Sequence, residues 1–201
     1  MLASVTADSV SAASSVIVAL AAAFAAWQGI RNLSAWREQT VGTRKIDLAE
    51  NALIQFYEIE HALKVIRSPM GNANESADRA QDVGERPTQK HALDIAHVSF
   101  KRMAAYHETI SSFRVSSLKV RAIFGDELYS QCLEVQKCWN EVSVAAHMLS
   151  MTPPEGYRDV EWKRSLEEKI WQLEDKDTSI QVRVAKAIES AERLLRPHLR
   201  S

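Results

Sequence analysis

Two pairs of a carboxylate and a histidine have the spacing that could hold a metal ion. Glu58 and His61 are three residues apart, and Asp94 and His97 repeat that spacing further along the chain. Residues three apart share one face of a helix, so each pair could point in one direction. A di-metal centre in a helical bundle also needs a glutamate from each of two other helices, and Glu141 would be a forced choice for one of them. We therefore expect solvated or interfacial pairs, with no metal or other cofactor.

A second spacing, an arginine followed five positions later by a histidine, could act on a phosphodiester. It occurs from Arg102 to His107 in RMAAYH and from Arg193 to His198 in RLLRPH. The pattern resembles the R-x4–6-H motif of RNases of the HEPN type, which are small helical bundles. That resemblance implies an RNase in which Arg102 and His107 act on the RNA backbone. The alternative is a half-buried structural histidine, because His107 continues a helical stripe with Met103.

Composition and missing motifs argue against several other classes. The sequence has no Gly-rich phosphate loop, no G-x-S-x-G, no H-E-x-x-H and no Cys/His zinc spacing. Its formal net charge is -1, so it has no overall basic field and we expect no nucleic-acid partner. Cys132 and Cys138 are separated by about 120° around a helix and should not bridge each other. Cysteines without framework spacing favour a reducing compartment.

The elements that must position these residues begin with an uncharged segment, 9–30. As a helix it would be about 33 Å long, enough to cross the roughly 30 Å hydrocarbon core of a bilayer. We expect a single transmembrane helix, with a cleaved signal peptide ending near Ala25 or a buried alanine-rich core helix as alternatives. Asp8 is the only charged side chain before the segment, and several cations follow it. This distribution predicts an inner-membrane protein with its N-terminus outside and its bulk in the cytoplasm. The cations are Arg31, Arg37, Arg44 and Lys45.

Two sets of residues would act at that membrane. Aromatic and basic side chains near the inner boundary suit the headgroup layer; they are Trp27, Arg31, Trp36 and Arg37. Ala21, Ala25 and Gly29 recur every four residues, so one helix face is small enough for a second backbone to approach closely. The expected partners are therefore the lipid bilayer and either another protein or a second copy of the chain.

The remainder of the chain has apolar residues at steps of three and four, which is typical of amphipathic helices. The residues predicted to face inward include Leu53 and Phe56 in the first helix and, further along, Leu128, Val135, Trp139, Val142, Ala146 and Leu149. The N-terminal helix is expected to continue to about Arg67, because Ser68-Pro69 disfavours further helix. The polar segment 68–87 lacks periodicity and predicts a flexible loop, with a partner-binding loop as the alternative.

Three more helices follow in this prediction. The first covers 88–124 and ends at Gly125, with Asp126 as the N-cap of the next helix. That next helix ends before Pro153, and the last one runs without a break from about 157 to 197. Helices of this length, joined by short turns and one long loop, most simply form an antiparallel bundle.

The prediction is thus an all-α protein with a short extracytoplasmic tail (1–8), a transmembrane helix (9–30) and a cytoplasmic bundle of about four long helices (31–201). We favour a membrane-anchored, non-catalytic interaction or scaffold module over an enzyme, because the anchor and the helical faces are clearer than any catalytic site. The alternatives are a membrane-tethered RNase of the HEPN type, a di-metal enzyme, and a pore-forming effector that uses the N-terminal span.

Overall fold

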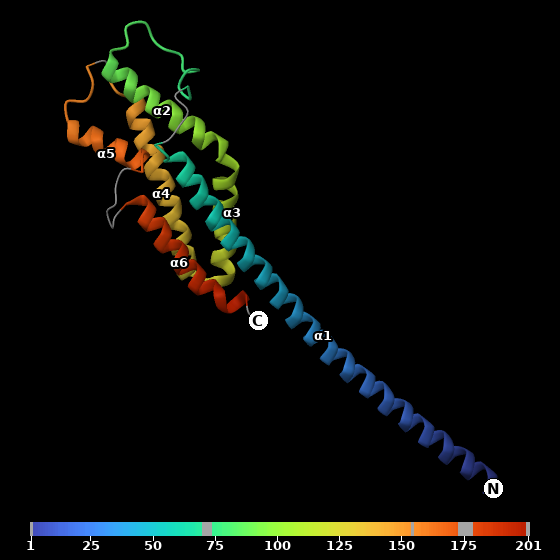
Figure 1. The fold of residues 1–201 in the computed structure, drawn as a ribbon. Helices are drawn as coiled ribbons and strands as arrows, with labels where there is room; N and C mark the ends of the chain where they lie inside the picture. Colours follow the sequence, from blue (N-terminus) through green and yellow to red (C-terminus); the bar gives the residue numbers. More distant parts are fainter. Residues whose placement is uncertain (1, 70–73, 154, 173–178, 200–201) are drawn as a thin grey trace. The chain divides into compact units, whose positions relative to one another are not determined.

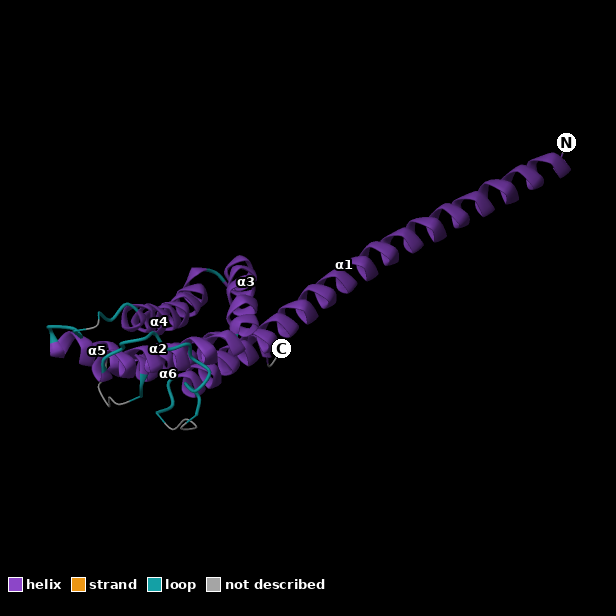
Figure 2. Ribbon diagram, turned by 90° about the horizontal axis from the view of Figure 1, so that it is seen from above, coloured by secondary structure: helices purple, strands orange, loops and turns teal. Residues whose placement is uncertain are grey.

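Helices are the regular secondary structure in the part of the chain that the structure describes. This computed structural model describes residues 2–69, 74–153, 155–172 and 179–199, and the side chains of the first helix from residue 20 onward except at 34, 35 and 38. Those ranges contain no strand (Figure 2), which confirms the all-α prediction. The described helices are α1 (Leu2–Ile66), α2 (Pro87–Ala105), α3 (His107–Phe124), α4 (Asp126–Ser150), α5 (Val160–Ile170) and α6 (Ile180–Leu199) (Figure 1).

The chain divides into two compact units, residues 1–46 and residues 47–201. The second unit has a hydrophobic core to which α1, α3, α4 and α6 contribute. Phe56 of α1 and Phe113 of α3 meet there edge to face, with their ring centroids 5.1 Å apart. Both rings are almost fully buried. The amphipathic stripe predicted for this part of α1 is therefore the side that packs into the bundle.

A second core cluster joins α2, α4 and α5, so α4 belongs to both clusters. Figure 1 shows α4 among the other helices of this unit, and it packs against α2, α3, α5 and α6. Every apolar residue that the stripe of this helix predicts to face inward is buried; these residues are Leu128, Val135, Trp139, Val142, Ala146 and Leu149. A helix with neighbours on several sides must bury a wide apolar face.

Several predicted helix ends are confirmed. The first helix ends at Ile66, directly before Arg67. Gly125 separates α3 from α4 with φ of 86°, a backbone conformation that side chains with a Cβ rarely adopt. Because α3 and α4 pack together across this single residue, they form an antiparallel pair. The helix α4 ends at Ser150, before Pro153, as predicted.

Two predicted helices are broken instead of continuous. The segment 88–124 divides at Tyr106, whose φ of -109° and ψ of 16° end α2 and begin α3. The segment 157–197 divides after Ile170, because Trp171 is extended, with φ of -99° and ψ of 141°. The predicted continuity across 173–178 lies outside the described residues. A phase-matched stripe therefore did not guarantee one helix.

The details of two helix ends also differ from the prediction. Gly125 occupies the N-cap position of α4, and no side-chain hydrogen bond caps that helix, so Asp126 is not its N-cap. Asp159 does cap α5, accepting a hydrogen bond of 2.9 Å from the backbone N–H of Trp162. Pro197 lies inside α6, two residues before its end at Leu199, and does not end the helix.

The predicted single-pass membrane topology is wrong, as judged by the length and hydropathy of the described helices. Among the described residues, no helix is both long enough and apolar enough to cross a bilayer. Residues 20–30 are the part of the predicted span whose side chains are described, and they would cover only about 16 Å as a helix; side chains 9–19 lie outside that description. The inner-membrane localisation is corrected accordingly, and the pore-forming alternative depended on the same span.

Candidate functional site

Arg102, the arginine of the predicted RNase motif, lies where the end of α1 meets α2. Its Nη1 donates to the backbone carbonyls of Val65, Ile66 and Ser68 at 3.2, 3.3 and 2.7 Å. Its Nη2 lies 2.6 Å from a carboxylate oxygen of Glu75. A helix C-terminus leaves carbonyls without partners, so Arg102 caps α1 and holds the following segment in place.

The described contacts of Arg102 do not include His107. The break at Tyr106 separates them, and the described partners of Arg102 are the carbonyls, Glu75 and the ring of Trp171. His107 is exposed at the start of α3. In the second match, Arg193 is exposed and makes only a 3.5 Å contact with Ser190, while the ring of His198 lies 5.0 Å from that of Phe124.

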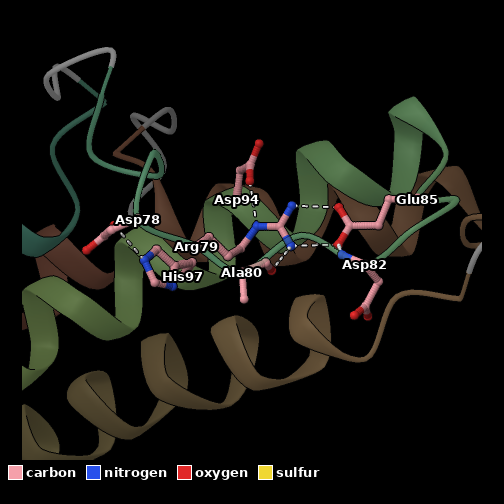
Figure 3. Close-up of polar contacts among 7 residues, drawn as sticks. All are labelled: Asp78, Arg79, Ala80, Asp82, Glu85, Asp94 and His97. Carbon is pink, nitrogen blue, oxygen red and sulfur yellow. Dashed lines mark hydrogen bonds and ion pairs between the residues drawn. The ribbon is translucent and has the colours of Figure 1, made fainter.

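A more elaborate arrangement of charges lies between the loop of residues 74–86 and α2 (Figure 3). The Arg79 guanidinium donates two parallel hydrogen bonds, of 2.8 and 2.7 Å, to the Glu85 carboxylate. Its Nε donates to Asp94 of α2 at 2.7 Å. The side chains of Arg79 and Glu85 are only 10% and 6% exposed. Charge-assisted bidentate pairs are strong and directional, so Arg79 fixes the loop against α2.

A second contact joins the same loop to α2. Asp78 accepts from Lys101 at 2.7 Å and lies 3.0 Å from Nε2 of His97 (the His97 contact is drawn in Figure 3). These two partners hold the pKa of the Asp78 carboxyl at about 2. The pKa of Glu85 is also lowered to about 2, chiefly by its hydrogen bonds from Arg79. Both carboxylates are therefore charged at neutral pH.

The four residues predicted as weak metal ligands do not share a contact in the described structure. Asp94 is bonded to Arg79, and His97 is bonded to Asp78. Glu58 and His61 are exposed on α1. The described residues contain no group of three or more His, Cys, Asp or Glu side chains placed to hold a metal. Asp94 and His97 are thus used in polar contacts with the loop of residues 74–86.

Acidification is expected to detach the loop of residues 74–86 from α2. The pKa values of Asp78 and Glu85 are lower in the folded chain than the roughly 4 of an unfolded one. Their ion pairs therefore stabilise the attached loop above about pH 4, and this stabilisation is lost as the pH falls toward 2. NMR titration of the Glu85 side-chain carboxyl should give a midpoint near 2. In Arg79→Gln the midpoint should rise; a wild-type midpoint near 4 would contradict the ion pair.

A third cluster holds α6 against α4. The Arg183 guanidinium donates two hydrogen bonds to Glu141, at 2.8 and 2.9 Å, and one to Glu134 at 2.7 Å. Glu141, which the sequence offered as a further metal ligand, is thus used in an ion pair with Arg183. The neighbouring Cys138 and Cys132 are free and buried, and burial raises the pKa of each thiol, to about 11 and about 12. Thiols of this kind are poor nucleophiles at neutral pH.

The N-terminal unit has a different character. Seven large apolar side chains between residues 20 and 41 are 51–69% exposed; they are Leu20, Phe24, Trp27, Ile30, Leu33, Trp36 and Val41. The rings of Phe24 and Trp27 lie 5.9 Å apart, and the guanidinium of Arg31 lies 5.1 Å from the ring of Trp27. The membrane role predicted for Trp27, Arg31, Trp36 and Arg37 loses its basis with the correction above, but their exposure still requires an explanation.

The predicted small-residue face is also uncovered. Ala21, Ala25 and Gly29 are exposed, and nothing lies within 4 Å of the position that a Cβ at Gly29 would occupy. Sequence reasoning missed Glu75, Asp78 and Arg79 as partners of α2, and it missed Glu85 as the partner of Arg79. The alternation of acidic and basic residues in that loop was the available signal, but it did not identify the partner of each charge.

No family model, no curated protein and no solved structure matches the chain. The fold and the side-chain contacts define an all-α helical-bundle protein with an apolar helical surface in its N-terminal unit.

Proposed function

We propose that this protein is a non-catalytic interaction module that associates with a second copy of itself through residues 20–41 of α1. The observation that carries the proposal is the exposure of seven large apolar side chains in this one stretch of helix. Single exposed apolar residues are ordinary, whereas a contiguous apolar surface marks a place where another molecule binds. The bundle of residues 47–201 has its own core, and self-association through residues 20–41 would link the bundles of the associated copies.

The distribution of these residues around the helix supports burial by a partner. Leu20, Phe24 and Trp27 lie on one side, while Leu33 and Trp36 lie on the opposite side. Large apolar side chains on two opposite sides of a helix cannot all be hidden from water by one neighbouring surface. One neighbour on a single face would not suffice, so the proposal allows dimers and higher assemblies.

Two features favour a second copy as the partner. The stretch from Leu20 to Ile30 carries no charge, so two copies would meet without repulsion there. Ala21, Ala25 and Gly29 leave one face without bulk, and small residues let helix backbones approach closely. The non-catalytic part of the proposal is supported by Arg102, Asp94 and His97, whose polar groups are used in contacts within the bundle.

Sedimentation velocity on the full chain tests the proposal. We expect the wild-type chain to be dimeric or larger at about 10 μM. A Phe24→Ser, Trp27→Ser, Ile30→Ser variant should associate at least about 100-fold more weakly, because each buried side chain of this size contributes about 1.5–3 kcal/mol. Ala25→Ile should also weaken association if the small face is the contact.

The matched control removes three exposed apolar residues from α3 of the bundle, in Val115→Ser, Leu118→Ser, Ile123→Ser. It should leave the assembly unchanged. A monomeric wild-type chain would overturn the proposal, as would an equal loss of assembly in both triple variants.

A further inference from the structure

A groove opens between α4 and the break that separates α2 from α3. Its volume is about 310 Å³, which is at the small end of the range for ligand sites. Phe100 and Met103 of α2, Ile110 of α3 and Trp139 of α4 provide its apolar lining. Ile110 and Trp139 are 3% and 5% exposed, whereas Phe100 is 38% exposed. The groove therefore has a buried apolar floor and an open side.

The polar lining of this groove is basic. Among the described residues that line it, His107 and Arg114 are the titratable ones and none is a carboxylate. The described side-chain partner of Arg114 is a neutral acceptor, Oδ1 of Asn140, at 3.0 Å from Nη2. By contrast, the groove that Lys64 and Arg67 line also includes Glu60. An anion placed here would meet a cation and no competing acid.

We propose that this groove binds a small amphipathic carboxylate, with an aromatic or branched aliphatic body on the apolar floor and its carboxylate against Arg114. A guanidinium presents a planar fork of N–H donors that matches a carboxylate, and His107 also lines the groove. The volume suits one ring system and not a helix of a partner protein. This site is independent of the self-association proposed above, because all of its residues belong to the bundle.

The test is an NMR titration of the full chain labelled with ¹³C at the methionine methyls. Naphthylacetate is the probe, and naphthylethanol is its uncharged analogue with the same ring. We expect the Met103 signal to shift to saturation with naphthylacetate. Met148 and Met151, which do not line the groove, should not shift and serve as internal controls.

Two arginines of the same helix provide the matched variants. Arg114→Gln should weaken naphthylacetate binding by about tenfold or more and leave naphthylethanol binding unchanged, since only the charged hydrogen bond is lost. Arg121→Gln should change neither, because Arg121 pairs with Asp126 outside the groove. Absence of a Met103 shift would overturn the proposal, and so would equal shifts at all three methionines or an equal effect of Arg114→Gln on both probes.

Discussion

Replacement of Phe56 by alanine is expected to lower the free energy of unfolding of the bundle by about 3–5 kcal/mol. The ring is 1% exposed and meets Phe113 edge to face at 5.1 Å. Its removal deletes buried apolar surface and leaves a cavity that the surrounding helices can close only in part. Urea unfolding, followed by tryptophan fluorescence and by circular dichroism, measures this loss.

Two variants separate a core effect from a general effect on α1. Ile54, on the same helix, is 53% exposed, so Ile54→Ala should change the free energy by less than about 1 kcal/mol. Phe56→Leu keeps most of the volume and should lose less than Phe56→Ala. A loss at Phe56→Ala no larger than at Ile54→Ala would show that α1 does not pack into the bundle as described.

The burial of Phe56 is among the features that periodicity predicted correctly. Apolar residues at steps of three and four fix one side of a helix, and that side must be covered whatever the neighbours are. The same reasoning placed all six predicted inward residues of α4 in the core. It could not predict that α4 would have four helical neighbours, because a stripe gives the direction of the core and not what lies across it.

The helix breaks at Tyr106 and Trp171 could not be predicted from the periodicity of apolar residues. Neither position has a proline or glycine beside it, and the apolar stripe keeps its phase across the break near Trp171. What differs is tertiary: α2 and α5 share one core cluster, whereas α3 and α6 share the other. The two parts of each predicted helix thus pack into different clusters, so tertiary packing overrides local propensity at the break.

The charged contacts between the loop of residues 74–86 and α2 show a related limit. The spacing of Asp94 and His97 was recognised, but spacing along one helix says nothing about which charges a distant loop will bring. Their partners Arg79 and Asp78 lie 15 and 19 positions earlier in the chain. Identical residue types thus satisfy a metal-site pattern in sequence and form ion pairs in the fold.

Replacement of Arg102 by alanine is expected to destabilise the bundle by about 2–4 kcal/mol. The side chain is 10% exposed, and its loss would remove a donor from the carbonyls of Ile66 and Ser68 and from the Glu75 carboxylate. Buried acceptors without donors lose their hydration and gain nothing in return. Arg102→Lys should recover little of the stability, because one ammonium cannot reach the acceptors that the guanidinium fork spans. Urea unfolding measures each variant.

Arg193 offers the matched control, because it begins the other Arg-x4-His match but is exposed and has only a 3.5 Å contact with Ser190. Arg193→Ala should change the free energy of unfolding by less than about 0.5 kcal/mol. The pair of variants also separates the two interpretations of the motif. A structural Arg102 predicts loss of stability in Arg102→Ala, whereas a catalytic Arg102 predicts a stable variant that has lost RNA cleavage shown by the wild-type chain. An Arg102→Ala chain as stable as Arg193→Ala would therefore refute the capping role and return Arg102 to the catalytic candidates.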